Sequence, residues 1–342
     1  MKYASMLRVA GVTWIAGAVW MVLAFATGAQ AAGERTIELR RKLLDPTQGI
    51  FVIAHRGCHN AIPSKGPRSR QGLDSVPENS LAALERCIAL RVDMMETDIH
   101  RTRDGALVIM HDDTVDRTTD GSGAVADLTL AEIRQLHLRR NMGAPTAMAL
   151  TSERVPTLDE LLARAKGRIL INLDIKGPIY REVIEAAVRD GVANDVVAKR
   201  RATSADSVLA DSEPFRNVPF AVILDGRPAD ATPQALSDVV LRQASGSRPL
   251  AFVELSLLSV EQMRAAVVAA WKVHVRVMSN TLSGVVGVVD GGGDEDALRD
   301  PAGVWGRLMG EGITAFQTDE PAALLDFSLL AQRRSGRYAG GH

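Results

Sequence analysis

Three carboxylates lie near the ends of apolar runs in the first half of the chain. Glu96 and Asp98 fall within residues 94–99, and Asp174 directly follows residues 169–173. Side chains alternate along a strand, so Glu96 and Asp98 point to one face. Carboxylates held together repel unless a cation or a proton joins them, and oxygen ligands select hard cations. We therefore expect one divalent cation, Mg²⁺ or Ca²⁺, bound by Glu96, Asp98 and Asp174; water-exposed acids on a strand edge are the alternative.

Two histidines also follow apolar runs. His55 and Arg56 come after one run, and His111 and Asp112 come after another. Histidine can move a proton near neutral pH, and arginine can grip a phosphate through paired donors. We expect His55 and His111 to be proton-transfer groups. Asp112 either orients an imidazole or caps a turn.

Lys176 lies two residues after Asp174 and points the same way if both belong to a strand. It would supply a point charge to a phosphoryl oxygen; a surface ion pair with Asp174 is the alternative. Two histidines, three carboxylates and two cations at neighbouring strand ends suit phosphoryl transfer, in which positioning and charge neutralisation do most of the work.

These side chains need a scaffold that brings strand ends together. Nine apolar runs are strand candidates, namely residues 50–54, 94–99, 106–111, 169–175, 195–198, 219–224, 251–255, 273–278 and 315–318. Helical patterns lie between most of them, and strands that alternate with helices form a parallel sheet covered by helices. Eight such strands close a barrel, whose carboxyl ends carry the catalytic residues in barrel enzymes.

The expected fold is therefore α/β, a single (β/α)8 barrel with one irregular βα unit. The irregularity is at residues 102–105 (TRDG), which leave no room for a helix between two strand candidates. We assign residues 32–49 to an N-terminal lead-in, residues 50–330 to the barrel and residues 331–342 to a flexible tail.

Local signals add detail to this scheme. Residues 129–136 and 157–165 each begin with a threonine and carry a glutamate three residues later, which predicts a capping box at the start of a helix. Residues 291–296 (GGGDED) predict a flexible loop whose acids stay hydrated.

The first 31 residues predict a signal peptide. Lys2 and Arg8 precede an almost entirely apolar stretch, residues 9–26, and residues 29–31 (AQA) match the small-x-small pattern that signal peptidase accepts. We expect cleavage after Ala31 and a secreted or periplasmic protein. Because the apolar run approaches the ~20 residues that span a bilayer, a membrane anchor is the alternative, with membrane contact only through the uncleaved leader.

Composition limits the possible partners. A formal net charge of −1 provides no basic field for a nucleic-acid backbone. Cys58 and Cys87 are the only cysteines, and two cysteines can pair in an oxidising compartment. However, Cys58 follows a predicted strand, Cys87 lies in a predicted helix, and no spacing rule makes them neighbours. We favour two separate buried thiols, with pairing left open.

The motifs, taken together, resemble those of the glycerophosphodiester phosphodiesterase family. Roughly residues 50–326 carry the resemblance, through AHRG (54–57), PENS (77–80), ETDI (96–99), TRDG (102–105), HDDT (111–114), DRTTDGSG (116–123), LTL (128–130), VPTL (155–158), DIK (174–176) and TDEP (318–321). Each motif alone is weak, but their order and spacing together are highly specific.

The resemblance implies a triosephosphate-isomerase-type barrel that hydrolyses glycerophosphodiesters to glycerol 3-phosphate and an alcohol with a divalent cation. It assigns roles by position: general acid and base to His55 and His111, substrate binding to Arg56, Lys176 and Glu78, and metal binding to Glu96, Asp98 and Asp174. Glu78 would serve the metal or an arginine.

The chain departs from the family pattern at four places. Asp174 stands where a glutamate is expected, and Met278 stands where a tryptophan is expected on a late strand. Lys199-Arg200-Arg201 replace an expected Ser-Phe pair, and residues 58–76 form a long basic loop with Lys65, Arg68 and Arg70. We expect that loop to form part of the rim. Because these differences lie where a leaving group would bind, the sequence leaves the alcohol open.

Two other functions compete with this interpretation. A lysophospholipase D-like phosphodiesterase on the same barrel would need an apolar channel beside the site. Low aromatic content, 4%, and the charged first loop favour a small polar glycerophosphodiester instead. A non-catalytic binding protein of this fold is the second alternative, against which the intact histidines and carboxylates argue.

Overall fold

The computed structural model describes residues 33–61, 73–142, 149–282 and 284–339. The predicted signal peptide and the basic side chains Lys65, Arg68 and Arg70 of the first loop lie outside the described residues. Within the described part of the chain, no helix is both long and apolar enough to cross a bilayer.

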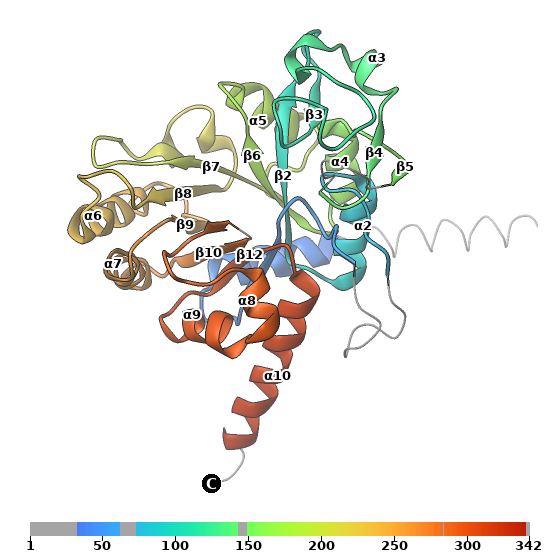
Figure 1. Cartoon of the computed structure of the whole chain (residues 1–342). Coiled ribbons are helices and arrows are strands. Elements are labelled where there is room, and N and C mark those ends of the chain that lie inside the picture. Colours follow the sequence, from blue (N-terminus) through green and yellow to red (C-terminus); the bar gives the residue numbers. More distant parts are fainter. Residues whose placement is uncertain (1–32, 62–72, 143–148, 283, 340–342) are drawn as a thin grey trace, which may run out of the picture.

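Eight parallel strands close into a barrel (Figure 1). They are β1 (Phe51–Ala54), β2 (Met94–Arg101), β6 (Leu170–Ile175), β7 (Val196–Arg201), β8 (Phe220–Asp225), β9 (Phe252–Ser256), β10 (Arg276–Leu282) and β12 (Ala315–Thr318). Because β1 pairs with both β12 and β2, the sheet has no open edge between its first and last strands. The predicted barrel is confirmed, and each of its strands coincides with one of the strand candidates.

Helices cover the outside of the barrel (Figure 1). They are α2 (Leu81–Leu90), α4 (Leu158–Ala165), α5 (Tyr180–Arg189), α6 (Pro233–Gln243), α7 (Val260–Lys272), α8 (Asp294–Arg299), α9 (Arg307–Gly310) and α10 (Pro321–Ala339), with single 3-10 turns at Val125–Asp127, Leu209–Asp211 and Phe215–Asn217 and a π-helical turn at Ala302–Gly306. The predicted capping box at Thr157 begins α4. α10 continues as a helix to Ala339, where the sequence predicted a flexible tail from residue 331.

The irregular unit follows β2. After the turn at residues 102–105, β3 (Leu107–Ile109) returns antiparallel to β2, so the ninth strand candidate lies outside the barrel. α3 (Leu130–Ile133) and the hairpin of β4 (His137–Arg139) and β5 (Leu150–Arg154) then build a small separate core around Val108, Ile133 and Val155. The capping box at Thr129 is present, but its helix has only four residues and is shorter than predicted.

The antiparallel pairing of β3 with β2 explains how His111 reaches the barrel mouth. The Met110 N–H donates to the Asp98 carbonyl at 3.0 Å. His111 therefore returns to the level of the rim on a chain that runs opposite to the barrel strands. The expectation that His111 ends a barrel strand was wrong, although the histidine still lies beside the strand ends. A further short strand, β11 (Val285–Val286), pairs antiparallel with β10.

The N-terminal lead-in is part of the barrel's structure. Residues 33–44 form a helix, and its Leu39 and Leu43 pack into a buried apolar cluster with Phe51, Phe252 and Met278 from the strands. Because these strand residues lie at or near the amino ends of their strands, the helix closes that end of the barrel. Burial of this apolar surface stabilises the barrel on the side opposite the strand carboxyl ends.

Arg276 fixes this helix to the barrel. Its side chain is 1% exposed, and it donates five hydrogen bonds of 2.6–3.0 Å to the carbonyls of Lys42, Asp45, Gly49 and Thr314. A guanidinium has five N–H donors, so all of them are used. Burial lowers the pKa of Arg276 to about 10.

The two cysteines form a disulfide. Cys58 and Cys87 are bonded, with their Cα atoms 5.2 Å apart, so the prediction of two separate thiols was wrong. The sequence could not predict this pairing, because the distance between the loop after β1 and α2 depends on how that helix packs on the barrel. The bond ties the residue after the Arg56-Gly57 turn to a rigid helix.

Replacing Arg276 tests whether the lead-in is structural. Arg276→Met should remove all five part-buried hydrogen bonds of the guanidinium and lower the free energy of unfolding by about 3–5 kcal/mol, because polar groups that lose a partner on folding keep their desolvation cost. Urea unfolding followed by circular dichroism measures the change. Arg264→Met is the control, since Arg264 pairs with Glu311 on the exposed surface. Equal urea midpoints for Arg276→Met and the wild type would contradict the structural role.

Candidate active site

A sharp turn after β1 brings a backbone donor into the barrel mouth. Arg56 and Gly57 have φ values of 51° and 85°. A Cβ atom on Gly57 would lie 2.8 Å from Ala83 Cβ and 2.9 Å from Met95 Cε, so only glycine fits. The turn directs the Arg56 N–H to Glu96 Oε2, at 2.9 Å. Close packing against β2 and α2 therefore fixes the start of the site.

The three carboxylates lie together at the mouth of the barrel. Glu96 and Asp98 are on one face of β2, and Asp98 is in register with Asp174 on β6. One oxygen from each lies within 4.8 Å of the others. Glu96 and Asp98 are 1% exposed. The structure thus brings the predicted ligand set together, in positions that period-two alternation and parallel register impose.

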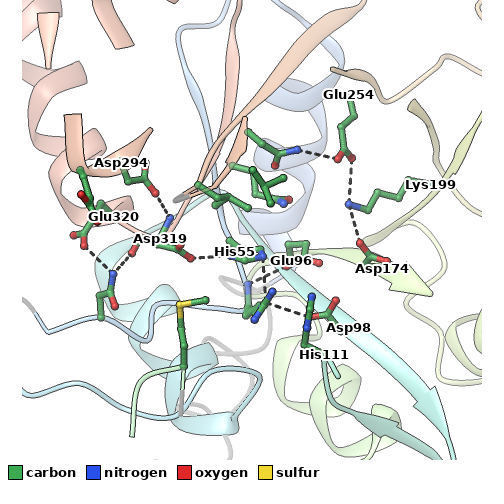
Figure 2. A pocket seen from close by; sticks show the side chains of 18 of the residues that line it. His55, Glu96, Asp98, His111, Asp174, Lys199, Glu254, Asp294, Asp319 and Glu320 are labelled. Carbon is green, nitrogen blue, oxygen red and sulfur yellow. Dashed lines mark hydrogen bonds and ion pairs between the residues drawn. The ribbon is translucent and has the colours of Figure 1, made fainter. Parts of the chain in front are cut away.

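Two lysines share these carboxylates. Lys176 Nζ lies 2.7 Å from Asp98 Oδ1 and 3.1 Å from Asp174 Oδ1. Lys199, on β7, reaches Asp174 Oδ2 at 3.4 Å and Glu254 Oε2, on β9, at 3.1 Å. Figure 2 shows Lys199 between Asp174 and Glu254. The Asp174 carboxylate thus contacts both lysines, one through each of its oxygens.

Positive charge does not fully compensate the three carboxylates. Burial, followed by repulsion from Asp98, raises the pKa of Glu96 well above its ordinary value. Burial also acts to raise the pKa of Asp98, but Lys176 and other nearby positive charges outweigh it, so that pKa is lowered. Glu96 is therefore the carboxylate that most needs a further cation or a proton.

His55 is held by Asp319, which directly follows β12, the last strand of the barrel. Its Nδ1 lies 2.7 Å from Asp319 Oδ1, and Arg56 Nε donates to its Nε2 at 3.2 Å. A ring that donates through Nδ1 and accepts at Nε2 is neutral. Burial lowers the pKa of His55, and Asp319 opposes that shift. At neutral pH this histidine can accept a proton at Nε2.

A second buried histidine uses the same carboxylate oxygen. His59 Nε2 lies 3.2 Å from Asp319 Oδ1, and His59 Nδ1 lies 2.8 Å from Asn141 Oδ1. Burial acts to lower the pKa of His59, but the hydrogen bond to Asp319 and its charge outweigh burial and raise it. Sequence reasoning missed His59, since it lies in a loop outside the strand ends.

His111 is held by a different chain of ion pairs. Its Nδ1 lies 2.6 Å from Asp112 Oδ1, and Arg117 donates to both Asp112 oxygens at 2.7 and 2.9 Å. Arg117 also bonds to Glu78, which accepts in turn from Arg56 Nη1 at 3.2 Å. Asp112 therefore orients an imidazole, one of its two predicted roles.

These contacts place Glu78 behind the site. It is 2% exposed and bonds to two arginines, Arg56 and Arg117. Glu78 does not line the cavity of about 340 Å³ at the barrel mouth. The other seven predicted site residues do line it, namely His55, Arg56, Glu96, Asp98, His111, Asp174 and Lys176. The sequence predicted that Glu78 would contact either the metal or an arginine, and its hydrogen bonds are to arginines.

Several residues of the site escaped the sequence analysis. Lys199, Glu254, Asn280 and Asp319 all line the cavity. Asp319 lies in the TDEP motif directly after β12, and its place at a strand end was the available signal. Lys199 begins the basic run at the end of β7, which the sequence analysis noted without assigning a role to this side chain, and Glu254 is a single charge in an otherwise apolar strand.

Asp294 overturns the expectation of a hydrated loop at residues 291–296. It is 3% exposed at the start of α8, and it accepts from Thr281 Oγ1 and Thr318 Oγ1 at 2.7 Å and from the Asp319 N–H at 2.7 Å. Burial raises the pKa of Asp294 to about 7. The glycines let the chain fold back so that this carboxylate supports Asp319 (Figure 2).

Removing the charge of Asp319 should change the titration of both neighbouring histidines. Asp319→Asn is expected to lower the pKa of His55 and of His59, because the carboxylate stabilises the charged form of each ring. NMR titration of the ring carbons measures both values. Asp120→Asn is the control, since Asp120 contacts His137 outside the cavity. Unchanged titration of both histidines in Asp319→Asn would contradict the arrangement described above.

Comparison with known proteins gives the geometry a context. The chain is 42% identical over 130 residues to a glycerophosphodiester phosphodiesterase from Caldanaerobacter subterraneus subsp. tengcongensis, a match that covers 38% of this chain and 46% of the relative. It is 37% identical over 141 residues to human glycerophosphodiester phosphodiesterase 1, covering 41% of this chain and 38% of the relative. The matches thus span half or less of these curated relatives.

Solved structures share the fold. A glycerophosphoryl diester phosphodiesterase from Parabacteroides distasonis superposes with a TM-score of 0.63 at 18% identity, covering 87% of this chain and 92% of the other. An Oleispira antarctica phosphodiesterase in complex with the product sn-glycerol-3-phosphate gives a TM-score of 0.51 at 20% identity, covering 81% and 96%. The sequence profile of the glycerophosphoryl diester phosphodiesterase family matches residues 55–280. This chain therefore belongs to the glycerophosphoryl diester phosphodiesterase family.

Proposed function

We propose that this protein hydrolyses glycerophosphodiesters to glycerol 3-phosphate and an alcohol, with one divalent cation, Mg²⁺ or Ca²⁺. The observation that carries the proposal is a single cavity whose lining includes two histidines, the carboxylate cluster of Glu96, Asp98 and Asp174, and the cations Arg56, Lys176 and Lys199. Membership of the family and the names of the relatives support a glycerophosphodiester as substrate. The Oleispira antarctica protein, of the same fold, binds sn-glycerol-3-phosphate.

The carboxylate cluster fits a hard divalent cation. Glu96, Asp98 and Asp174 offer only oxygen ligands, which favour Mg²⁺ or Ca²⁺ over Zn²⁺. The raised pKa of Glu96, caused by burial and by Asp98, marks a place where positive charge is wanting. Bound by these three residues, the cation would stabilise negative charge on the phosphoryl oxygens as a Lewis acid.

The protein's own cations would bind the remaining phosphoryl charge. Arg56 and Lys176 line the cavity, and each lies beside a carboxylate of the cluster. Arg56 Nε also bonds to His55 Nε2. When a phosphate draws the guanidinium toward itself, that nitrogen becomes free to accept a proton. Substrate binding would thus uncover the base.

The two histidines would divide the proton transfers at one phosphorus. His55 and His111 lie at the same cavity (Figure 2). His55 is neutral and would deprotonate the attacking oxygen, which belongs to water or to the neighbouring glycerol hydroxyl. His111, whose Nδ1 lies 2.6 Å from Asp112 Oδ1, would protonate the leaving alkoxide. General acid–base catalysis of this kind contributes ~10²–10⁴-fold to a rate.

Product analysis tests the activity and its cation together. Glycerophosphocholine, glycerophosphoethanolamine and lysophosphatidylcholine would be incubated with the protein before and after exhaustive EDTA treatment, and the products identified by mass spectrometry. We expect glycerol 3-phosphate from the first two substrates, loss of turnover in EDTA, and recovery with Mg²⁺ or Ca²⁺. Turnover that survives EDTA would refute the metal requirement.

The panel also separates the alternatives. Met142, Leu282, Val285 and Leu298 form an apolar part of the cavity wall, the kind of feature that a lysophospholipase D-like enzyme requires. Preferred cleavage of lysophosphatidylcholine would establish that activity instead. Binding of glycerophosphocholine without turnover in the presence of either metal would identify a non-catalytic binding protein.

Variants of the histidines test the mechanism. His55→Gln and His111→Gln should each lower kcat by ~10²–10⁴-fold, and the double variant should lose far less than the product of both effects because the residues act as a unit. With a nitrophenyl phosphodiester, which needs no protonation of its leaving group, His111→Gln should recover most activity while His55→Gln should not. His137→Gln, outside the cavity, is the control. Near-wild-type turnover in both single variants would exclude this assignment.

We also propose that the leader exports the protein. The apolar stretch at residues 9–26 and the AQA site support a secreted or periplasmic location, and the disulfide between Cys58 and Cys87 fits an oxidising compartment. A mature N-terminus at Ala32 is the expected mark of cleavage, and intact Met1 in the membrane fraction would indicate an anchor instead.

A further inference from the structure

The barrel interior changes from apolar to polar in one step. Leu170, Val197, Phe252, Met278 and Ala315 belong to the apolar cluster that the N-terminal helix closes. Two residues further along the same strands, and so on the same face, the side chains are Asn172, Lys199, Glu254, Asn280 and Gln317. All five are buried, with exposures of 0–5%. The last four line the cavity.

This polar layer is incompletely satisfied from within. Asn280 Nδ2 donates to Glu254 Oε1 at 3.1 Å, and Asn172 Nδ2 lies 3.4 Å from Gln317 Oε1. Among the described residues, Asn172 Oδ1 and Asn280 Oδ1 have no hydrogen-bond partner. Of these two residues only Asn280 lines the cavity. Because buried polar atoms are nearly always paired, its open acceptor at the cavity wall indicates a ligand that donates a hydrogen bond.

Charge and shape narrow the class of that ligand. Glu254 is neutralised by Lys199, which lies 3.1 Å from Oε2, so the layer has no free charge to attract an ion. None of the described residues that line the cavity is aromatic, whereas quaternary ammonium groups such as choline are typically recognised by aromatic rings. A neutral group that both donates and accepts hydrogen bonds, namely a hydroxyl, fits best.

We propose that Lys199, Glu254 and Asn280 form a subsite that binds the terminal hydroxyl of the substrate's glycerol group. Lys199 connects this subsite to the carboxylate cluster, since its ammonium contacts both Asp174 and Glu254. A phosphate bound at that cluster would therefore direct its glycerol into the polar layer and its other alcohol toward the rim. The assignment rests on the proposed function and adds the reason for a glycerol preference.

The wild-type protein provides the first test. Glycerophosphocholine would be compared with the phosphocholine ester of propane-1,2-diol, attached through its primary oxygen. This analogue lacks only the terminal hydroxyl and keeps the neighbouring one, so it can react whether the attacking oxygen comes from water or from the substrate. A subsite that hydrogen-bonds a hydroxyl rejects an analogue without it, and we expect a kcat/KM at least ~10-fold lower. Equal kcat/KM values would overturn the proposal.

Asn280→Leu then tests the role of this residue. Its kcat/KM would be measured with both glycerophosphocholine and the deoxy analogue. The variant should lose ~10-fold or more with glycerophosphocholine and little with the deoxy analogue, because the missing contact is already absent there. A purely structural role would lower both substrates alike and would overturn the assignment. Asn194→Leu is the matched control, since Asn194 is exposed before β7, at the opposite end of the barrel.

A binding measurement keeps this inference separate from the proposed activity. By calorimetry with the protein loaded with Mg²⁺, sn-glycerol 3-phosphate should bind ~10-fold or more tightly than propane-1,2-diol 1-phosphate, and Asn280→Leu should remove the difference. If neither diester is hydrolysed but this difference is found, the proposed function fails and the subsite stands. If glycerophosphocholine is hydrolysed while both phosphates bind equally, the subsite fails and the function stands. If Asn280→Leu instead changed the relative turnover of glycerophosphocholine and glycerophosphoethanolamine, Asn280 would contact the leaving group, and the proposal would be overturned.

Discussion

Electrostatic repulsion among Glu96, Asp98 and Asp174 explains which cations and hydrogen-bond donors surround them at the barrel mouth. Three carboxylates within one small, buried volume are costly unless positive charge or hydrogen-bond donors surround them. Lys176 and Lys199 lie among them, the Arg56 N–H donates to Glu96, and Asn79 Nδ2 donates to Asp98. The partial compensation leaves a site suited to a further cation.

Two other carboxylates, Glu78 and Asp112, help to place the histidines proposed for proton transfer. A chain of ion pairs runs from Arg56 through Glu78, Arg117 and Asp112 to His111. Arg56 also contacts His55, so the two histidines are joined behind the cavity by alternating guanidinium and carboxylate groups. Glu78, Arg117 and Asp112, which lie inside this chain, each have charged partners on both sides, so their positions restrain one another.

What the sequence predicted follows from local periodicity. Glu96 and Asp98, or Asp174 and Lys176, share a strand face by alternation alone, and the end of an apolar run places them at a rim. Glu254 and Lys199 meet only because β9 and β7 lie on the same side of a closed barrel, and a sequence does not state which strands face each other. The disulfide escaped for the same reason.

The burial of Asp294 contradicted a prediction made from composition, and the helix in the lead-in had not been predicted. A glycine-rich acidic stretch predicts a hydrated loop, yet the glycines allow a close approach in which three donors satisfy one buried carboxylate. The lead-in has no strand pattern, but its two leucines complete a core that the strands leave open. In both cases the tertiary partner decides the outcome, and local propensity has little influence.

The disulfide links the order of the active-site turn to the compartment in which the chain folds. Cys58 lies between the Arg56-Gly57 turn and His59, so the bond to α2 fixes the loop that holds one side of the site. In a reducing cytosol the thiols would stay apart, and this loop would depend on noncovalent contacts alone. Under the proposed export, a newly made chain would then hold the Arg56-Gly57 turn less firmly than the exported protein. Phosphodiesters inside the cell would meet a less organised site than those outside it.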